Sequence, residues 1–286
     1  MSQTFVPAVY PFGPHIGSSG GWEILDAKFT STHINPYPHT VVGELNAARA
    51  EGKTVVLMLA RTAGHYKNPD GTFNLDMWKA KIDQYAGFDF TPWIEDGTFA
   101  VHYLISEPMS RGRWGGKVIP AEVLDEMARY SKQYWPTLPT AVREQPTDLI
   151  HHAGGFRVAL PDWTWRYLDT SWARYSARKG PIDRFIADEV AAAKAQHLGL
   201  MFGMNVLQGG DGSSGIIGYK DNWVMSTVEL FDYGPKLINE PYGCAMLMWH
   251  YNKDDIVYFA RPEIDAAMND LAVLAWARAP RSCVAQ

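Results

Sequence analysis

The stretch TFAVHYLISEP at residues 98–108 decides the fold prediction, because it combines a strand with a sharp stop. Residues 99–105 predict a buried β-strand. Pro108 cannot donate a backbone hydrogen bond and favours an extended residue before it, so the strand should end at Glu107. A carboxylate at the carboxyl end of an apolar strand lies where parallel sheets carry their chemistry, which makes Glu107 a candidate functional residue. A salt bridge that only fixes a loop is the simpler explanation for this carboxylate.

Seven other stretches end in the same way, and most of the segments between them have apolar residues at helical spacing. The predicted strands are residues 6–12, 27–33, 53–60, 99–105, 139–143, 165–168, 200–206 and 243–250. For the sixth strand, residues 157–160 are the alternative. Eight strands alternating with about seven amphipathic helices predict a single (β/α)₈ barrel over residues 1–278, followed by a short disordered tail at 279–286. An open doubly wound sheet usually shows a glycine fingerprint at its first turn, and none is present.

Helix signals support this order. Asn74 precedes a helix that carries Trp78 on its apolar face, and Ser226 with Glu229 forms a predicted capping box. Pro262 opens the last helix.

Composition limits the function classes. The chain has 286 residues, 47% of them hydrophobic, which is enough for a large core. The formal net charge is −5 and no lysine or arginine block occurs, so nucleic acid is not an expected partner. The 13% aromatic content suits either a large core or a cleft that stacks on sugars. Cys244 and Cys283 are far apart, so we expect neither a disulfide framework nor a zinc site.

No apolar run reaches the length of a transmembrane helix, and the start of the chain lacks the features of a signal peptide. We therefore expect a soluble protein that does not act at a membrane. Whether it is the mature form of an exported protein stays open, as does its oligomeric state.

The residues that close the predicted strands are mostly polar or aromatic, and as a set they are typical of a carbohydrate site. The predicted substrate-binding residues are Tyr10, His33, Arg61, Arg143, Asn205, Gln208, Trp249, His250 and Tyr251. We expect a groove walled by Tyr10, Trp249 and Tyr251, with Trp114 or Trp163 as a further wall. Taken singly, each of these residues could equally be an ordinary rim or core residue.

Glycoside hydrolysis needs a protonated carboxyl group that donates to the leaving oxygen, and a second carboxylate that acts as nucleophile or as base on water. We expect Glu107 to be the acid, with a pKa raised by burial at the barrel mouth. Asp169, which closes the predicted sixth strand, is the expected partner. Glu144, Asp162 and Asp211 are the rivals, although Asp211 lies in the loop QGGDGSSG and is better explained as a solvated turn residue.

The Glu-Pro strand end, the aromatic eighth strand and the barrel pattern resemble the barrel glycoside hydrolases that place an acid/base glutamate after strand four. More closely, SEP with WGGKVIPAEVLDEMARYSK, WRYLDTSWARY and GLMFGMNVLQGG resembles a family of uncharacterised, often exported, hydrolase-like barrels. The resemblance covers most of the chain and implies a barrel hydrolase with Glu107 at its site. Members of that family read Asp-Glu-Pro where this chain has Ser106, and retaining barrel hydrolases end strand seven with a glutamate where this chain has Asn205.

Other chemistries fit less well. The histidines do not show the His-x-His spacing of metal-dependent barrel hydrolases, no predicted strand ends in a lysine that could form a Schiff base, and no Gly-x-Ser-x-Gly motif occurs. We therefore expect no metal and no cofactor. The alternative from a different class is a non-catalytic barrel that binds a glycan or a protein partner.

Overall fold

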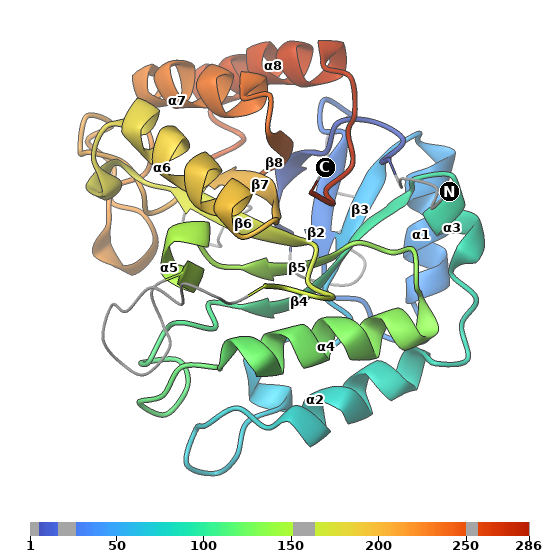
Figure 1. Cartoon of the computed structure of the whole chain (residues 1–286). Helices are drawn as coiled ribbons and strands as arrows, with labels where there is room; N and C mark the ends of the chain where they lie inside the picture. Colours follow the sequence, from blue (N-terminus) through green and yellow to red (C-terminus); the bar gives the residue numbers. More distant parts are fainter. Residues whose placement is uncertain (1–5, 17–26, 151–163, 250–256, 286) are drawn as a thin grey trace.

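The computed structural model describes residues 6–16, 27–150, 164–249 and 257–285, and it confirms the predicted (β/α)₈ barrel (Figure 1). The strands are β1 (Phe12–Pro14), β2 (Ser31–Ile34), β3 (Thr54–Leu57), β4 (Phe99–Ser106), β5 (Thr140–Arg143), β6 (Thr170–Tyr175), β7 (Gly199–Met204) and β8 (Gly243–Met248). All paired strands are parallel, in the order β1-β8-β7-β6-β5-β4-β3-β2. A parallel bridge between His15 and His33 and a hydrogen bond from Thr30 N to Phe12 O join the two ends of this sheet.

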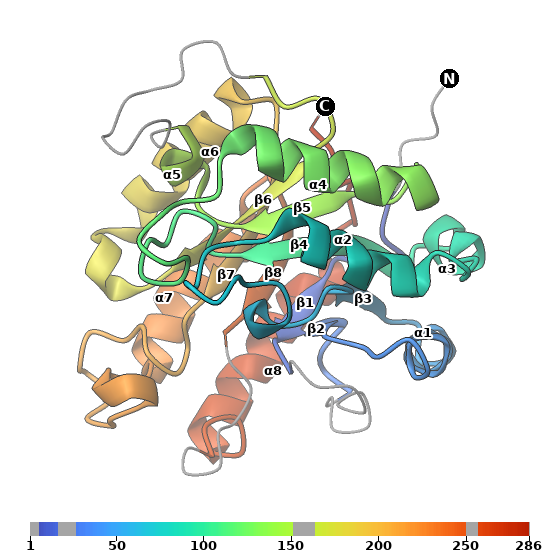
Figure 2. The same cartoon turned by 90° about the horizontal axis from the view of Figure 1, so that it is seen from below.

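The helices lie on the outside of the barrel (Figures 1 and 2). They are α1 (Val41–Ala50), α2 (Leu75–Ile82), α3 (Thr91–Glu95), α4 (Ala121–Tyr134), α5 (Pro146–Ile150), α6 (Ile182–Ala195), α7 (Thr227–Asn239) and α8 (Pro262–Ala277). The predicted caps are present, because Asn74 accepts from Met77 N and Ser226 forms a capping box with Glu229. Glu229 also accepts a hydrogen bond from Asp211 N, so this cap holds part of the long loop after β7.

The side chains of each strand point alternately to its two faces, and they form two clusters of buried residues. Most apolar strand residues pack against the helices, as Val55 and Leu57 do. Their neighbour Val56 belongs to a second, smaller cluster with Tyr103 and Trp172. Because successive side chains of a strand point to opposite faces, this second cluster fills the barrel interior.

The predicted strand positions are correct for β3, β4, β5, β7 and β8, and they are shifted or wrong for the others. β1 begins at Phe12, where the predicted strand ends, and β2 covers only the end of its predicted range. β6 is Thr170–Tyr175, so neither 165–168 nor 157–160 is the sixth strand, and residues 157–160 lie outside the described residues. The error in β6 has consequences for the site, because it places Asp169 before a strand and not after one.

Cys244 and Cys283 form a disulfide, a pairing that the sequence did not predict. Cys244 lies in β8, and Cys283 belongs to the inner cluster and is completely buried. A side chain at Gly199 would meet the Cys283 carbonyl oxygen at 1.9 Å, so the tail packs directly against the start of β7. The segment 279–285 is therefore an anchored plug at the amino-terminal end of the barrel and not a disordered tail.

Removal of this disulfide should lower stability strongly. The bond closes a loop with a sequence separation of 39, for which the loss of loop-closure entropy corresponds to roughly 3–4 kcal/mol. We expect the Cys283→Ser variant and the fully reduced wild type to melt at lower temperatures than the oxidised wild type. The two decreases should be similar to each other. An unchanged melting temperature, with both thiols shown to be free by a thiol assay, would contradict this role.

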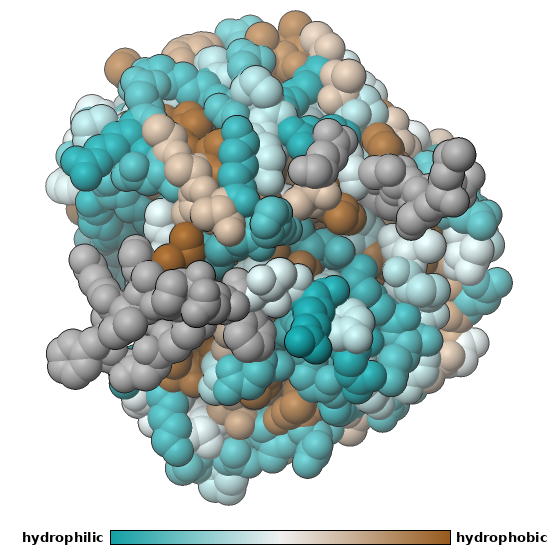
Figure 3. All heavy atoms as spheres, viewed as in Figure 1, coloured by the Kyte–Doolittle hydropathy of each residue, from teal (hydrophilic) through white to brown (hydrophobic). Residues whose placement is uncertain are grey.

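The outer surface is mixed in character. On the face in Figure 3, hydrophobic side chains form patches that are separated by hydrophilic ones. Within the described ranges, no helix is both long and apolar enough to span a bilayer.

Candidate active site

Glu107 follows β4 directly at the carboxyl end of the barrel, and its backbone has a φ of 52°. This left-handed conformation is uncommon for a residue with a side chain and costs about 1–3 kcal/mol. Two hydrogen bonds of 2.8 Å hold it, one from Glu107 N to Arg143 O and one from Trp114 Nε1 to Glu107 O. The turn is thus fixed from both sides, which is a common feature of functional positions.

Three arginines surround the Glu107 carboxylate. Arg174 Nη2 lies 2.5 Å from Oε1, and Arg143 Nη2 lies 3.7 Å from the same oxygen. Arg113 donates to Oε2 through Nε at 3.1 Å and contacts it through Nη2 at 2.9 Å. Charge-assisted contacts of this kind strongly favour the ionised carboxylate.

The pKa of Glu107 is therefore the opposite of the sequence prediction. Burial alone would raise it, but Arg143, Arg174 and Arg113 outweigh burial and lower the pKa from 4.5 to about 2. A group with this pKa holds no proton near neutral pH, so Glu107 is unsuited to the role of general acid. It remains suited to the role of a carboxylate nucleophile or base.

Each arginine comes from a different strand end or loop. Arg143 is the last residue of β5 and donates to Ser106 Oγ, and Arg174 in β6 donates to Asn205 Oδ1 at 3.0 Å. Arg113 lies in the loop after β4, which is held against the loop after β3 by a hydrogen bond from Lys67 Nζ to Arg113 O (Figure 2). Burial, and next the charge of Arg143, lower the pKa of Arg174 to about 10, which reflects how closely the cations are packed.

Aromatic rings border the same site. The guanidinium carbon of Arg143 lies 4.5 Å from the ring centre of Trp249, and that of Arg174 lies 5.3 Å from it. The rings of His15 and His33 stack at 4.1 Å, and His15 lies 4.7 Å from Trp249. These contacts give the mouth one wall of aromatic and imidazole rings.

A cavity of about 100 Å³ opens between these groups. Its lining residues come from the ends of β1 to β5 and from β8: they are His15, His33, Asn35, Met58, Thr62, Ala63, Tyr103, Ser106, Arg113, Arg143 and Trp249. The cavity therefore lies where the sequence places the active face of a parallel barrel.

Glu144 directly follows β5 at the carboxyl end of the barrel, although it is not among the residues that line the cavity. Its Oε2 accepts from Met109 N at 3.0 Å, and its Oε1 accepts from Gln145 N at 3.3 Å. Burial, with a further contribution from Asp148, raises the pKa of Glu144 to about 7 against these two hydrogen bonds. Glu107 is also among the charges that raise this pKa, so the two carboxyl groups influence each other.

Asp169 is not the partner of Glu107, although the sequence predicted this role. It precedes β6, and its Oδ2 accepts from Thr140 N at 2.7 Å and contacts Lys132 Nζ at 2.7 Å. Thr140 is the first residue of β5, so Asp169 lies at the amino-terminal end of the barrel, opposite Glu107. Its carboxylate joins the starts of two strands and is structural.

Tyr10 is also at the wrong end of the barrel for a substrate-binding residue. It precedes β1, is buried, and lies under the Arg278 guanidinium at 4.6 Å from its ring centre. Arg278 in turn donates to the carbonyl oxygens of Glu240 and Gly243 at the start of β8. The predicted first strand covered residues 6–12, whereas β1 is Phe12–Pro14, so Tyr10 was wrongly assigned to the carboxyl end of that strand.

The remaining predicted residues divide into three groups. His33, Arg143, Asn205 and Trp249 lie together at the mouth. Arg61 and Gln208 follow β3 and β7 at the same end: the Arg61 guanidinium stacks 3.2 Å from the ring centre of Tyr37, and Gln208 N donates to Asn205 O. His250, Tyr251, Asp162 and Trp163 lie outside the described residues.

Trp114 and Asp211 have structural surroundings. Trp114 is buried, stacks with Tyr66 and supports the Glu107 turn, so it does not form a wall of the groove. Asp211 is exposed, and hydrogen bonding by the Ser213 side chain and then by the Ser213 backbone N–H lowers its pKa, as in an ordinary turn.

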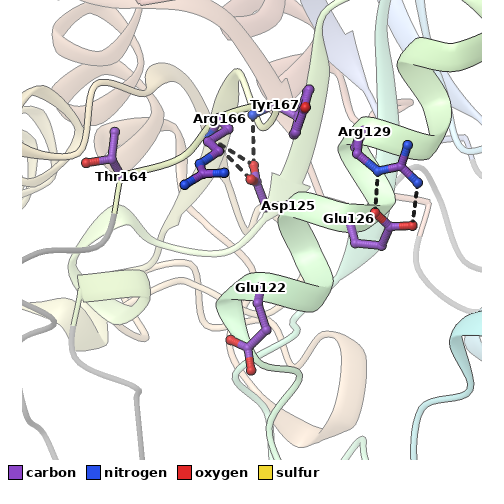
Figure 4. Close-up of a pocket in the computed structure, with 7 residues that line it drawn as sticks. All are labelled: Glu122, Asp125, Glu126, Arg129, Thr164, Arg166 and Tyr167. Carbon is purple, nitrogen blue, oxygen red and sulfur yellow. Dashed lines mark hydrogen bonds and ion pairs between the residues drawn. The ribbon is translucent and has the colours of Figure 1, made fainter.

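A larger cavity of about 550 Å³ lies away from the mouth, between α4 and residues 164–167 (Figure 4). Asp125 accepts backbone hydrogen bonds from Arg166, Tyr167 and Leu168 there, and Glu126 pairs with Arg129. Asp125 therefore fixes this loop to α4, whereas Glu126 pairs with a residue of its own helix.

Sequence reasoning missed His15, Arg113, Arg174 and Tyr103. Arg174 stands in the strand TSWARY, and recognising that strand would have revealed it. His15 follows directly from moving the first strand to its observed position. Arg113 lies in a loop and carries no local signal. Within the described ranges, no group of three or more His, Cys, Asp or Glu side chains is arranged to hold a metal ion.

No protein-family model and no curated protein matches the sequence. Solved structures match the fold along nearly the whole chain. A beta-glucanase from Saccharophagus degradans, in complex with cellotetraose, is 13% identical with a TM-score of 0.59, and the match covers 96% of this chain and 94% of that chain. Xylanase 10B from Thermotoga maritima is 11% identical with a TM-score of 0.54, over 93% and 95% of the two chains. The intracellular xylanase TsXylA from Thermoanaerobacterium saccharolyticum is 12% identical with a TM-score of 0.54, over 93% and 99%. The chain therefore shares its (β/α)₈ barrel with a beta-glucanase and two xylanases.

Proposed function

We propose that this protein is a glycoside hydrolase-type enzyme that cleaves glycosidic bonds of an oligo- or polysaccharide at the carboxyl end of its barrel. The observation that carries the proposal is a pair of carboxyl groups on neighbouring strand ends whose pKa values differ, about 2 for Glu107 and about 7 for Glu144. Two carboxyl groups with separated pKa values supply the acid and the base that glycoside hydrolysis needs. The fold shared with a beta-glucanase and xylanases supports the same reaction class.

The roles follow from the two environments. Glu144 keeps its proton up to about pH 7 and donates it to the glycosidic oxygen as the bond to the anomeric carbon breaks. Glu107 stays ionised and either attacks the anomeric carbon or takes a proton from the attacking water. Trp249 and the histidine pair offer ring faces to the sugar, and Asn205 offers an amide to its hydroxyl groups.

The Ser106-Glu107-Pro108 sequence fits the proposal. In the resembling hydrolase-like barrels an aspartate stands at the position of Ser106, which here accepts a hydrogen bond from Arg143. A serine keeps this hydrogen bond without adding a negative charge beside Glu107. We infer that the acid lost from this position is supplied by Glu144.

The pH dependence of hydrolysis tests the assignment. As the pH rises through about 7, Glu144 loses its proton, so kcat/KM should fall on the alkaline side with an apparent pKa near 7. Because the pKa of Glu107 is about 2, no matching fall should occur between pH 4 and 6. The measurement is kcat/KM against pH on cello- or xylo-oligosaccharides, or on any glycan the enzyme cleaves, because this ratio reports the pKa values of the free enzyme. A rate that rises through pH 7 would contradict the assignment.

A second candidate function is a barrel that binds a glycan without cleaving it. It is favoured by the contacts of Glu107 with three arginines, which satisfy its carboxylate without a substrate. Saccharide binding in calorimetry, without any new reducing ends after long incubation, would select this function.

The disulfide bears on where the protein works. Disulfides persist in oxidising compartments, so Cys244–Cys283 supports an exported protein. The expected partner there is a carbohydrate, since a chain of net charge −5 has little attraction for nucleic acid.

A further inference from the structure

The barrel mouth carries more positive charge than Glu107 needs. Arg113, Arg143 and Arg174 share a single ionised carboxylate, and Glu144, with its raised pKa, adds no full negative charge below pH 7. Buried charges are costly unless they are paired. Within the described residues, this corner of the mouth therefore has an excess of about two positive charges, since three guanidinium groups face one carboxylate.

Arg143 is the arginine whose hydrogen bonds are least used. It is 3% exposed and lines the cavity, and its Nη2 reaches Ser106 Oγ. Its contact with Glu107 is the longest of the three at 3.7 Å. Its Nε is buried and has no hydrogen-bond partner in the part of the chain that the structure describes. A guanidinium donates through five N–H groups, and an oxyanion can accept from several of them at once.

The size of the cavity fits a charged substituent. The cavity has a volume of about 100 Å³, several times what a single water molecule requires. That space accepts a carboxylate or a sulfate group. Arg113, which also lines the cavity, can approach such a group from the loop after β4.

We propose that the glycan recognised at this site carries an oxyanion on the sugar ring, a uronic-acid carboxylate or a sulfate ester, which enters the cavity and is bound by Arg143 and Arg113. This inference rests on the proposed function, because it names the substrate class of the same site. The ring that bears the anion stacks beside Trp249, which already lies over Arg143. An anion here also relieves the mutual repulsion of Arg143 and Arg174.

Matched oligosaccharides test this inference by binding alone, on a Glu144→Gln background in which turnover of oligosaccharides should be slower by about two to four orders of magnitude. The probes are tetrasaccharides with C6 as a hydroxymethyl, a carboxylate or a sulfate ester, in β-1,4, β-1,3 and α-1,4 linkage. We expect an acidic member to bind about tenfold tighter than its neutral counterpart at low salt, as hydrogen bonds to a charged group imply, with the preference shrinking as salt is added. The carboxylate and sulfate arms distinguish the two anions.

Variants distinguish binding of the anion by the cavity arginines from a general effect of the protein's positive charge. Arg113→Gln and Arg143→Gln should each reduce the acidic preference at least several-fold while neutral affinity changes little, and Arg143→Lys should restore part of it. Arg184→Gln, which removes a charge from a side chain 81% exposed on α6, is the matched control and should keep the preference. Thermal melts identify any variant that fails to fold. If Arg143→Gln fails to fold, Arg113→Gln still tests the inference.

The outcomes are distinguishable from failure of the proposed function. Equal binding of acidic and neutral members overturns this inference and leaves the hydrolase proposal standing. An acidic preference in a wild type that never cleaves the sugar supports this inference and counts against the hydrolase. Absence of binding to every probe, by protein with an unchanged melt, overturns both.

Discussion

Glu107→Gln should lower turnover of a cleaved glycan by about two to four orders of magnitude. Glutamine keeps the size of the side chain but cannot act as nucleophile or base, and it no longer neutralises the three arginines around it. KM should change much less than kcat if the carboxylate acts mainly in the transition state. The measurement is kcat and KM on the best substrate found, with the melting temperature recorded beside them.

Glu126→Gln is the matched control for this variant. Glu126 also contacts two cations, Lys79 and Arg129, and its pKa is likewise lowered to about 2, but it lies on α4 away from the mouth. We expect this control to keep wild-type turnover. The folding of Glu107→Gln should be retained because Arg174 keeps Asn205 and Arg143 keeps Ser106 as partners. Wild-type turnover in Glu107→Gln would remove Glu107 from the mechanism.

The barrel could be predicted because its strands and helices have separate hydrophobic patterns. β4 ends as predicted, since Pro108 imposes a stop that depends only on local geometry. The strand β6 could not be placed in the same way. The segment WRYLDTSWARY holds two apolar-aromatic runs, and a completely buried strand shows no alternation that would choose between them. The choice is made by tertiary contacts, because Asp125 on α4 binds the backbone of residues 166–168 and holds it as a loop.

The identity of the site carboxylates could be predicted only in part. The position of Glu107 followed from the strand end, whereas its pKa depends on Arg143, which the sequence placed at the site, and on Arg174 and Arg113. The last two are brought there by a strand that was misplaced and by a loop. Burial alone would have given the raised pKa that the sequence predicted. The disulfide was missed for a similar reason, because nothing local indicates that residue 283 returns to β8.

Glu144→Gln should have the second largest effect, and this effect should depend on the leaving group. On oligosaccharides, whose leaving oxygen needs a proton, we expect a loss of about two to four orders of magnitude. On aryl glycosides with acidic phenol leaving groups, protonation contributes little, so most of the activity should remain. The measurement compares kcat/KM of the variant on natural and activated substrates of the same sugar.

The pH dependence sharpens this prediction, because glutamine does not titrate. The alkaline fall near pH 7 in the wild type should disappear in Glu144→Gln. Stability should change in the same sense: the folded-state pKa lies above the ordinary value, so the contribution of the protonated form is present at low pH and is lost as the pH rises from about 4.5 to about 7. The variant should lack this loss.

Glu189→Gln is the matched control. Glu189 is a second glutamate whose pKa is raised by burial to about 7, but it lies on α6 and binds Thr147, so its replacement should leave activity unchanged. An equal loss on activated and natural substrates would show that Glu144 positions the site and does not donate the proton.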